Sequence, residues 1–168
     1  GKANYDEIVN NQTLSNFPAF EWIENNVNSA SLNGFSDWYL PARDEFQILY
    51  RNFKPTTSDN AIGARSTNSG FGDDDGDQFG KNNNSIPEDD GYTTNNPTQT
   101  NDTNFQKGNQ DALIDSLYWT STESSSNKSI IFNADVGGNG SSAKDTTRQV
   151  RATRRIFLSA PPFIFTAS

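Results

Sequence analysis

The sequence contains no cysteine, no histidine and no methionine among its 168 residues. These absences exclude a disulfide framework, a thiol nucleophile, a serine–histidine pair and the usual zinc sites. Only carboxylate, amide, lysine and tyrosine chemistry remains. A glycan-cleaving enzyme would need a carboxylate pair, for example Glu123 with Asp135, and nothing in their spacing supports that pairing. We therefore predict a protein without catalytic activity.

Long hydrophobic runs are missing as well. The longest, Ala160 to Phe165, is far shorter than the ~20 apolar residues that span a bilayer, so we expect no membrane insertion. Positive charge is also in short supply, since the chain carries a formal net charge of -8. That balance argues against a nucleic-acid partner.

Large aliphatic residues are scarce, whereas Asn, Ser and Thr make up about a third of the chain. Such a composition approaches that of disordered proteins. The aromatic residues, 12% of the chain, favour a folded domain because each can bury roughly 150–250 Å². We expect one domain over residues 1–158, in which long polar loops surround a small aromatic core.

Two segments of the N-terminal third have the hydrophobic period of a helix. One begins at Phe17-Pro18, and the other begins at Pro41 and ends before Lys54. Their apolar stripes are Phe20, Ile23 and Val27 in the first, and Phe46, Leu49, Tyr50 and Phe53 in the second.

The last third has strand character in three short runs, residues 118–122, 128–136 and 149–158. Between the helices and these strands, residues 56–110 show no hydrophobic period. We interpret them as a long insertion of ordered loops held by single aromatic residues, namely Phe71, Phe79, Tyr92 and Phe105.

Three motifs occur in the order found in one adhesin family. Residues 34–45 read GFSDWYLPARDE, residues 118–123 read YWTSTE and residues 150–155 read VRATRR. They resemble the G-[FY]-S-D-W-x-L-P-[ST]-x-x-E-L, Y-W-S-S-T-E and V-R-A-V-R-R motifs of the family typified by the C-terminal domain of the Legionella collagen-like adhesin. Residues 85–87, 91–100 and 105–108 resemble a linker found in the branch that tailed bacteriophages of aquatic bacteria carry.

This resemblance implies an α+β, C-type-lectin-like fold, with two helices packed on a small twisted antiparallel sheet. It also implies a receptor-binding or adhesin domain at the tip of a phage tail fibre, often homotrimeric, which contacts a host cell-surface glycan or protein. The expected location is the virion, or alternatively a bacterial surface. The alternative function is structural, as a decoration or subunit-contact domain of a virion or fibre.

The candidate contact surface is the polar region near residues 119–147. Its amides and hydroxyls both donate and accept hydrogen bonds, and Trp119 or Tyr92 could stack on a sugar ring. The alternative interpretation is a hairpin with solvent-facing polar residues. The candidate ligand-binding residues are Tyr92, Trp119, Ser121, Glu123, Asn133, Asp135, Asn139, Ser141, Lys144 and Asp145.

Other motif residues have a structural interpretation. We predict core packing for Trp38, Leu40, Trp119, Phe132 and Val150. Arg151 and Arg154 are expected either to pair with Asp37, Asp44 or Glu45 across the fold or to face a ligand.

One candidate metal site stands out, with calcium as the cofactor it would hold. Asp73, Asp75 and Asp77 place alternate carboxylates around a glycine, as a calcium loop does, although Asn84 stands where an EF-hand has glutamate. The alternative is a solvated acidic loop. The tail, residues 159–168, is apolar enough to fold back or to contact a neighbouring subunit.

Overall fold

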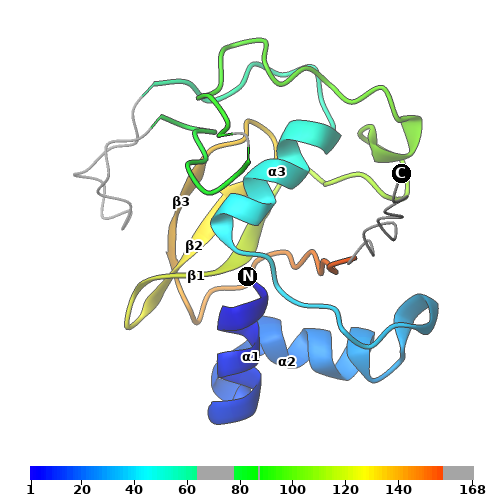
Figure 1. The fold of residues 1–168 in the computed structure, drawn as a ribbon, viewed down its shortest axis with the longest axis vertical. Helices are drawn as coiled ribbons and strands as arrows, with labels where there is room; N and C mark the ends of the chain where they lie inside the picture. The colour runs from blue at the N-terminus through cyan, green and yellow to red at the C-terminus, as the bar shows by residue number, and fades with distance from the viewer. Residues whose placement is uncertain (64–77, 87, 157–168) are drawn as a thin grey trace, which may run out of the picture.

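The computed structural model describes residues 1–63, 78–86 and 88–156. The fold is mixed α+β, as predicted, with helices preceding a small antiparallel sheet (Figure 1). The helices are α1 (Lys2–Asn11), α2 (Pro18–Ile23) and α3 (Arg43–Phe53), and the strands are β1 (Leu117–Ser125), β2 (Lys128–Asn133) and β3 (Asn139–Ala143). A π-helical turn, Glu24–Asn28, continues α2, and short 3-10 turns lie at Leu14–Asn16, Leu32–Gly34 and Thr103–Phe105.

The strands pair in the order β1-β2-β3 and place consecutive side chains on opposite faces. Tyr118 lies opposite Phe132, and the next residue, Trp119, lies opposite Ile131. Tyr118 and Phe132 pack with α3, whereas Trp119 packs with α1 and α2. In Figure 1, α3 crosses one side of the sheet, and α1 and α2 lie together below it. The sheet is therefore covered on both faces.

Each face of the sheet has its own hydrophobic core. The first core, between the sheet and α1 and α2, contains the buried residues Tyr5, Phe20, Ile23, Val27, Tyr39, Leu40, Trp119 and Ile131. The second, under α3, contains Phe46, Tyr50, Tyr92, Leu113, Tyr118, Phe132 and Ala134. Burial of Leu40, Trp119 and Phe132 confirms their predicted core role, and Trp38 and Val150 pack, partly buried, against the first core.

The two helices expected from the hydrophobic period are present, but the expectation of only two was wrong. The additional helix, α1, is held by tertiary contacts. Its Tyr5 ring stacks on Phe20 with centroids 5.2 Å apart, and its hydroxyl donates to Glu24 Oε1 at 2.8 Å. Because short helices are marginal alone, these contacts account for its stability.

The predicted strand over residues 149–158 does not form within its described part, residues 149–156. Only two isolated bridges occur there, Gln149 with Tyr118 and Thr153 with Tyr39. The segment changes partner between these bridges, so no continuous ladder develops. Its inward residues, Val150 and Ala152, still pack on the first core as the alternation indicated.

In its described parts, residues 56–63, 78–86 and 88–110, the long insertion is held by single aromatic side chains, as predicted. Tyr92 is part of the second core, Phe79 packs against that core, and Phe105 stacks on Phe53 at 4.3 Å between centroids. Phe71 lies outside the described residues.

Candidate functional site

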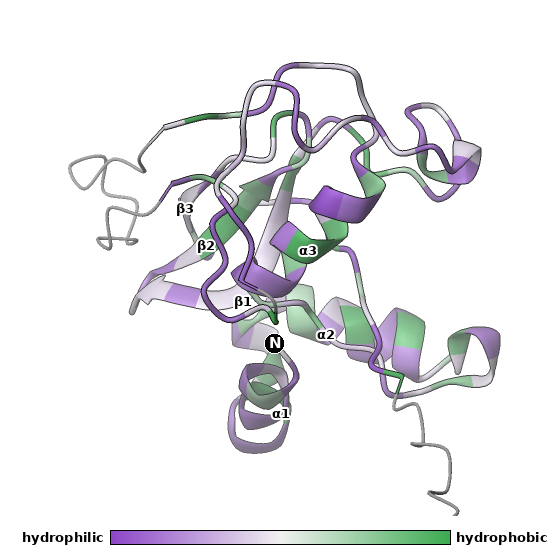
Figure 2. Ribbon diagram, turned by 45° about the horizontal axis from the view of Figure 1, so that its top comes forward, coloured by the Kyte–Doolittle hydropathy of each residue, from purple (hydrophilic) through white to green (hydrophobic). Residues whose placement is uncertain are grey.

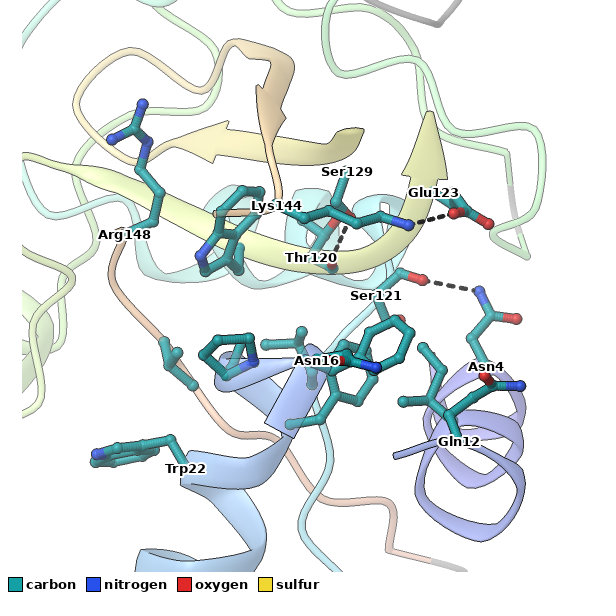
Figure 3. A pocket seen from close by; sticks show the side chains of 18 of the residues that line it. Asn4, Gln12, Asn16, Trp22, Thr120, Ser121, Glu123, Ser129, Lys144 and Arg148 are labelled. Carbon is teal, nitrogen blue, oxygen red and sulfur yellow. Dashed lines mark hydrogen bonds and ion pairs between the residues drawn. The ribbon is translucent and has the colours of Figure 1, made fainter. Parts of the chain in front are cut away.

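A groove of about 870 Å³ opens between the N-terminal helices and strand β1 (Figure 3). This volume lies within the range of roughly 300–1,000 Å³ that is typical of small-molecule sites. One wall comes from α1, α2 and the turn that joins them. The opposite wall comes from β1 and the segment after β3. The groove therefore lies on the face of the sheet that carries the first core.

The sheet wall contains five of the predicted ligand-binding residues, namely Trp119, Ser121, Glu123, Lys144 and Asp145. The first three lie on β1, whose pairing with β2 is irregular between Trp119 and Glu123. Trp119 is only 7% exposed, so it contributes part of the floor while it packs in the core. The Ser121 hydroxyl is buried and has no hydrogen-bond partner among the described residues.

Lys144 joins three elements at one end of the groove. Its ammonium pairs with Glu123 of β1 and donates to the Ser126 carbonyl at 3.2 Å. The same nitrogen lies 5.9 Å from the centre of the Phe17 ring, on the helical wall. Lys144 thus holds the hairpin end against the helices, and its charge is neutralised locally.

The helical wall was not predicted as part of a site. It contributes Asn4, Gln12, Asn16, Phe17 and Trp22, and Figure 3 shows the Trp22 indole at one end. Trp22 is 49% exposed, although its neighbours in α2, Phe20 and Ile23, are buried. The side-chain amides of Gln12 and Asn16 make no hydrogen bond within the described part of the chain. In the sequence, Trp22 lies outside the apolar stripe of Phe20, Ile23 and Val27, and this position is the signal that could have indicated a role at the surface.

Tyr92 does not reach the groove, so its prediction as a sugar-stacking residue is wrong. Its ring is 4% exposed and lies in the second core beside Tyr50, on the other face of the sheet. The Arg51 guanidinium lies 5.1 Å from its centre. A single aromatic residue in a polar loop either stacks on a ligand or packs into the core and holds the loop in place. Tyr92 packs into the core.

The remaining predicted residues do not line the groove. Asn133 ends β2 and Asp135 lies in the turn after it, and the Asn133 side chain accepts from the Asp135 amide at 3.0 Å. Asn139 and Ser141 lie on β3, half-buried. Because β1 and β2 are antiparallel, Asp135 lies beyond the Leu117 end of β1 and Glu123 near the opposite end. The fold does not bring this carboxylate pair together.

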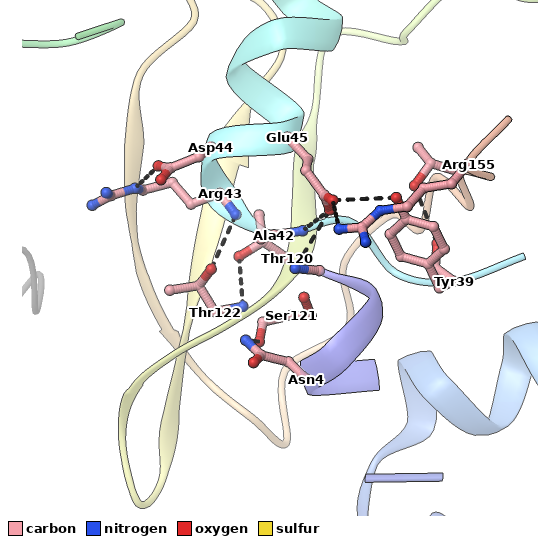
Figure 4. A network of polar contacts seen from close by, with 12 residues as sticks. Asn4, Tyr39, Ala42, Arg43, Asp44, Glu45, Thr120, Ser121, Thr122 and Arg155 are labelled. Carbon is pink, nitrogen blue, oxygen red and sulfur yellow. Dashed lines mark hydrogen bonds and ion pairs between the residues drawn. The ribbon is translucent and has the colours of Figure 1, made fainter. Parts of the chain in front are cut away.

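A polar network joins the start of α3 to β1 and to the C-terminal segment (Figure 4). Glu45 accepts from the Ala42 amide at 3.0 Å, from the Tyr39 hydroxyl at 3.2 Å and from Arg155 at 3.0 Å. The Arg43 amide donates to Thr122 Oγ1. The network fixes α3 on the sheet.

The predicted pairing of Arg154 is confirmed, because its guanidinium pairs with Asp37 and stacks 3.6 Å from the centre of the Phe35 ring. Arg151 forms no ion pair with Asp37, Asp44 or Glu45 in the described part of the chain. Arg155 takes its place on Glu45, and Asp44 pairs with Arg43 at 2.7 Å.

Glu45 makes stability sensitive to acid. Burial alone would raise its pKa, but the hydrogen bonds from Ala42 and Arg155 outweigh burial and hold the pKa below its ordinary value of 4.5. The unfolded chain then binds the extra proton, so the stabilisation is present above pH 4.5 and is lost as the pH falls through the folded value.

We expect Glu45→Gln to lower the free energy of unfolding by about 1–3 kcal/mol at pH 7, because charged hydrogen bonds are lost. Urea denaturation from pH 7 to pH 3 should show this difference shrinking. Glu7→Gln, at an exposed position in α1, is the control and should leave stability almost unchanged. A Glu45→Gln difference that stayed constant down to pH 3 would contradict the assignment.

The candidate metal residues Asp73, Asp75 and Asp77 lie outside the described residues. Within residues 1–63, 78–86 and 88–156, no cluster of three or more carboxylates could hold a metal ion. In the same ranges, no helix has the length and apolarity needed to cross a membrane.

Comparison with known proteins adds no relative. No family model, no curated protein and no solved structure matches the chain. A functional proposal therefore depends on the geometry of the groove and on the motif resemblance.

Proposed function

We propose that this chain is a non-enzymatic receptor-binding or adhesin domain that acts at the tip of a bacteriophage tail fibre, as part of the virion. The observation that carries the proposal is the groove, whose walls combine aromatic residues with amides and hydroxyls. Such surfaces suit the edges and faces of a host glycan or of a varied protein surface. The motif resemblance supports the same function, and it supports a C-type-lectin-like fold and a homotrimer.

The domain should compete with its parent particle for host cells. Cells pre-incubated with an excess of purified domain should adsorb several-fold fewer particles, and the heat-denatured domain should have no effect. Undiminished adsorption at saturating domain would contradict a receptor-binding role. That outcome would favour a structural decoration or subunit-contact domain, in which exposed apolar residues such as Leu32 and Phe35 contact other subunits.

A further inference from the structure

The charged residues of the groove restrict the chemistry of its ligand. The lining contains three carboxylates, on Glu7, Glu123 and Asp145, and two cations, on Lys144 and Arg148. Lys144 pairs with Glu123. Arg148 donates to Ser142 Oγ at 3.1 Å and to the Thr147 carbonyl at 2.9 Å, both uncharged acceptors, and it forms no ion pair within the described residues.

With Arg148 counted, the charged residues of the lining carry a net formal charge of -1. Glu7 and Asp145 are exposed and form no ion pair within the described part of the chain. The whole chain adds a net charge of -8. Sulfated, sialylated or phosphorylated ligands would therefore meet repulsion, both during approach and after binding.

The uncharged side chains of the groove include an indole and two amides, which suit a sugar ring and its hydroxyl groups. Trp22 offers a half-exposed indole at one end of the groove, and on the same wall the Asn16 amide lies in the middle and the Gln12 amide toward the other end (Figure 3). An indole packs on the apolar face of a sugar ring, while amides donate to and accept from its hydroxyls. Trp22 is free for this role because α2 buries its opposite stripe.

We infer that the groove binds a short uncharged oligosaccharide, with one sugar ring stacked on Trp22 and the hydroxyls of the following rings hydrogen-bonded by Asn16 and, toward the other end of the groove, by Gln12. This inference depends on the proposed function, because it names the ligand class of that site. It also moves the site from the hairpins alone to a surface shared with the N-terminal helices.

Binding to immobilised oligosaccharides tests the ligand class directly. The probes are neutral di- to tetrasaccharides of glucose, galactose, mannose and N-acetylglucosamine, beside sulfated and sialylated oligosaccharides of the same length. We expect binding to at least one neutral probe and to none of the charged probes. Binding only to charged probes, or no binding to neutral probes at millimolar concentration, would overturn the inference.

Titration calorimetry with the best neutral probe tests the residue. We expect Trp22→Ala to weaken binding about tenfold, Trp22→Phe to weaken it less, and Gln12→Ala to weaken it severalfold. The matched control is Phe35→Ala, at an aromatic residue of similar exposure that does not line the groove, and it should bind like the wild type. Unchanged binding by a folded Trp22→Ala domain would overturn the inference.

The adsorption assay separates this inference from the proposed function. Wild-type domain that blocks adsorption, together with Trp22→Ala that blocks equally well, would retain the function and overturn the groove assignment. Neutral-sugar binding that Trp22→Ala weakens, without any block of adsorption by the wild type, would retain the groove assignment and overturn the function.

Discussion

Replacing Phe132 with alanine should lower the free energy of unfolding by about 3–5 kcal/mol, the usual cost of a large cavity in a packed core. The Phe132 side chain is completely buried at the centre of the second core. Its ring lies 4.8 Å from that of Phe46 and 5.5 Å from that of Tyr50, both on α3. Because the loss approaches the total stability of many domains, a large unfolded fraction is expected at 25 °C.

Chemical denaturation followed by circular dichroism measures this loss. The matched control is Phe35→Ala, the same change at a side chain that is 43% exposed and contacts Arg154. It should cost no more than about 1 kcal/mol, the value of an exposed cation–π contact. Equal losses at the two positions would contradict the placement of Phe132 in the core.

The second large effect is expected at Gly137, in the turn between β2 and β3. Its backbone has a φ of +75°, and a Cβ there would lie 2.4 Å from Tyr50 Cε1 and 2.8 Å from Tyr92 Cε2. Gly137→Ala should therefore add the cost of a left-handed backbone, about 1–2 kcal/mol, to an overpacking cost of about 1–3 kcal/mol. We expect a total loss of about 2–5 kcal/mol.

Gly34→Ala separates these two contributions. Gly34 has a similar φ of +81°, but a Cβ there meets nothing within 4 Å. Thermal or chemical denaturation should show a loss of about 1–2 kcal/mol for Gly34→Ala, the backbone cost alone. If Gly137→Ala were no worse than Gly34→Ala, the close approach of Tyr50 and Tyr92 to this turn would be contradicted.

Local patterns in the sequence were sufficient to predict α2, α3, β1 and β2. In α3, Phe46 and Tyr50 lie four residues apart on the predicted apolar stripe, and both are completely buried. The apolar and aromatic runs in β1 and β2 likewise predict strands, and consecutive residues of each are buried because the sheet is covered on both faces. The helix α1 has fewer apolar residues, and its stability comes from Phe20 and Glu24, which a local pattern cannot report.

The candidate site could be predicted only on its sheet side. Trp119, Ser121 and Glu123 belong to the polar region that was predicted as the contact surface, whereas Gln12, Asn16 and Trp22 join them only through packing between segments about a hundred residues apart in sequence. The burial of Tyr92 depends on a tertiary contact that the local sequence does not indicate. A Cβ on Gly80 would lie 2.1 Å from the Tyr92 ring, so the absence of that side chain leaves the space in which the ring is buried.

The contacts between the Tyr39–Glu45 region and residues 153–155 also affect how the chain folds. Tyr39 and Thr153 exchange backbone hydrogen bonds of 2.9 Å, and Arg155 reaches Glu45 from 110 residues away. Contacts of such high sequence separation close late, because a long loop must first be ordered. During synthesis, α3 can form early, but its network with Arg155 is complete only after residue 155 has left the ribosome.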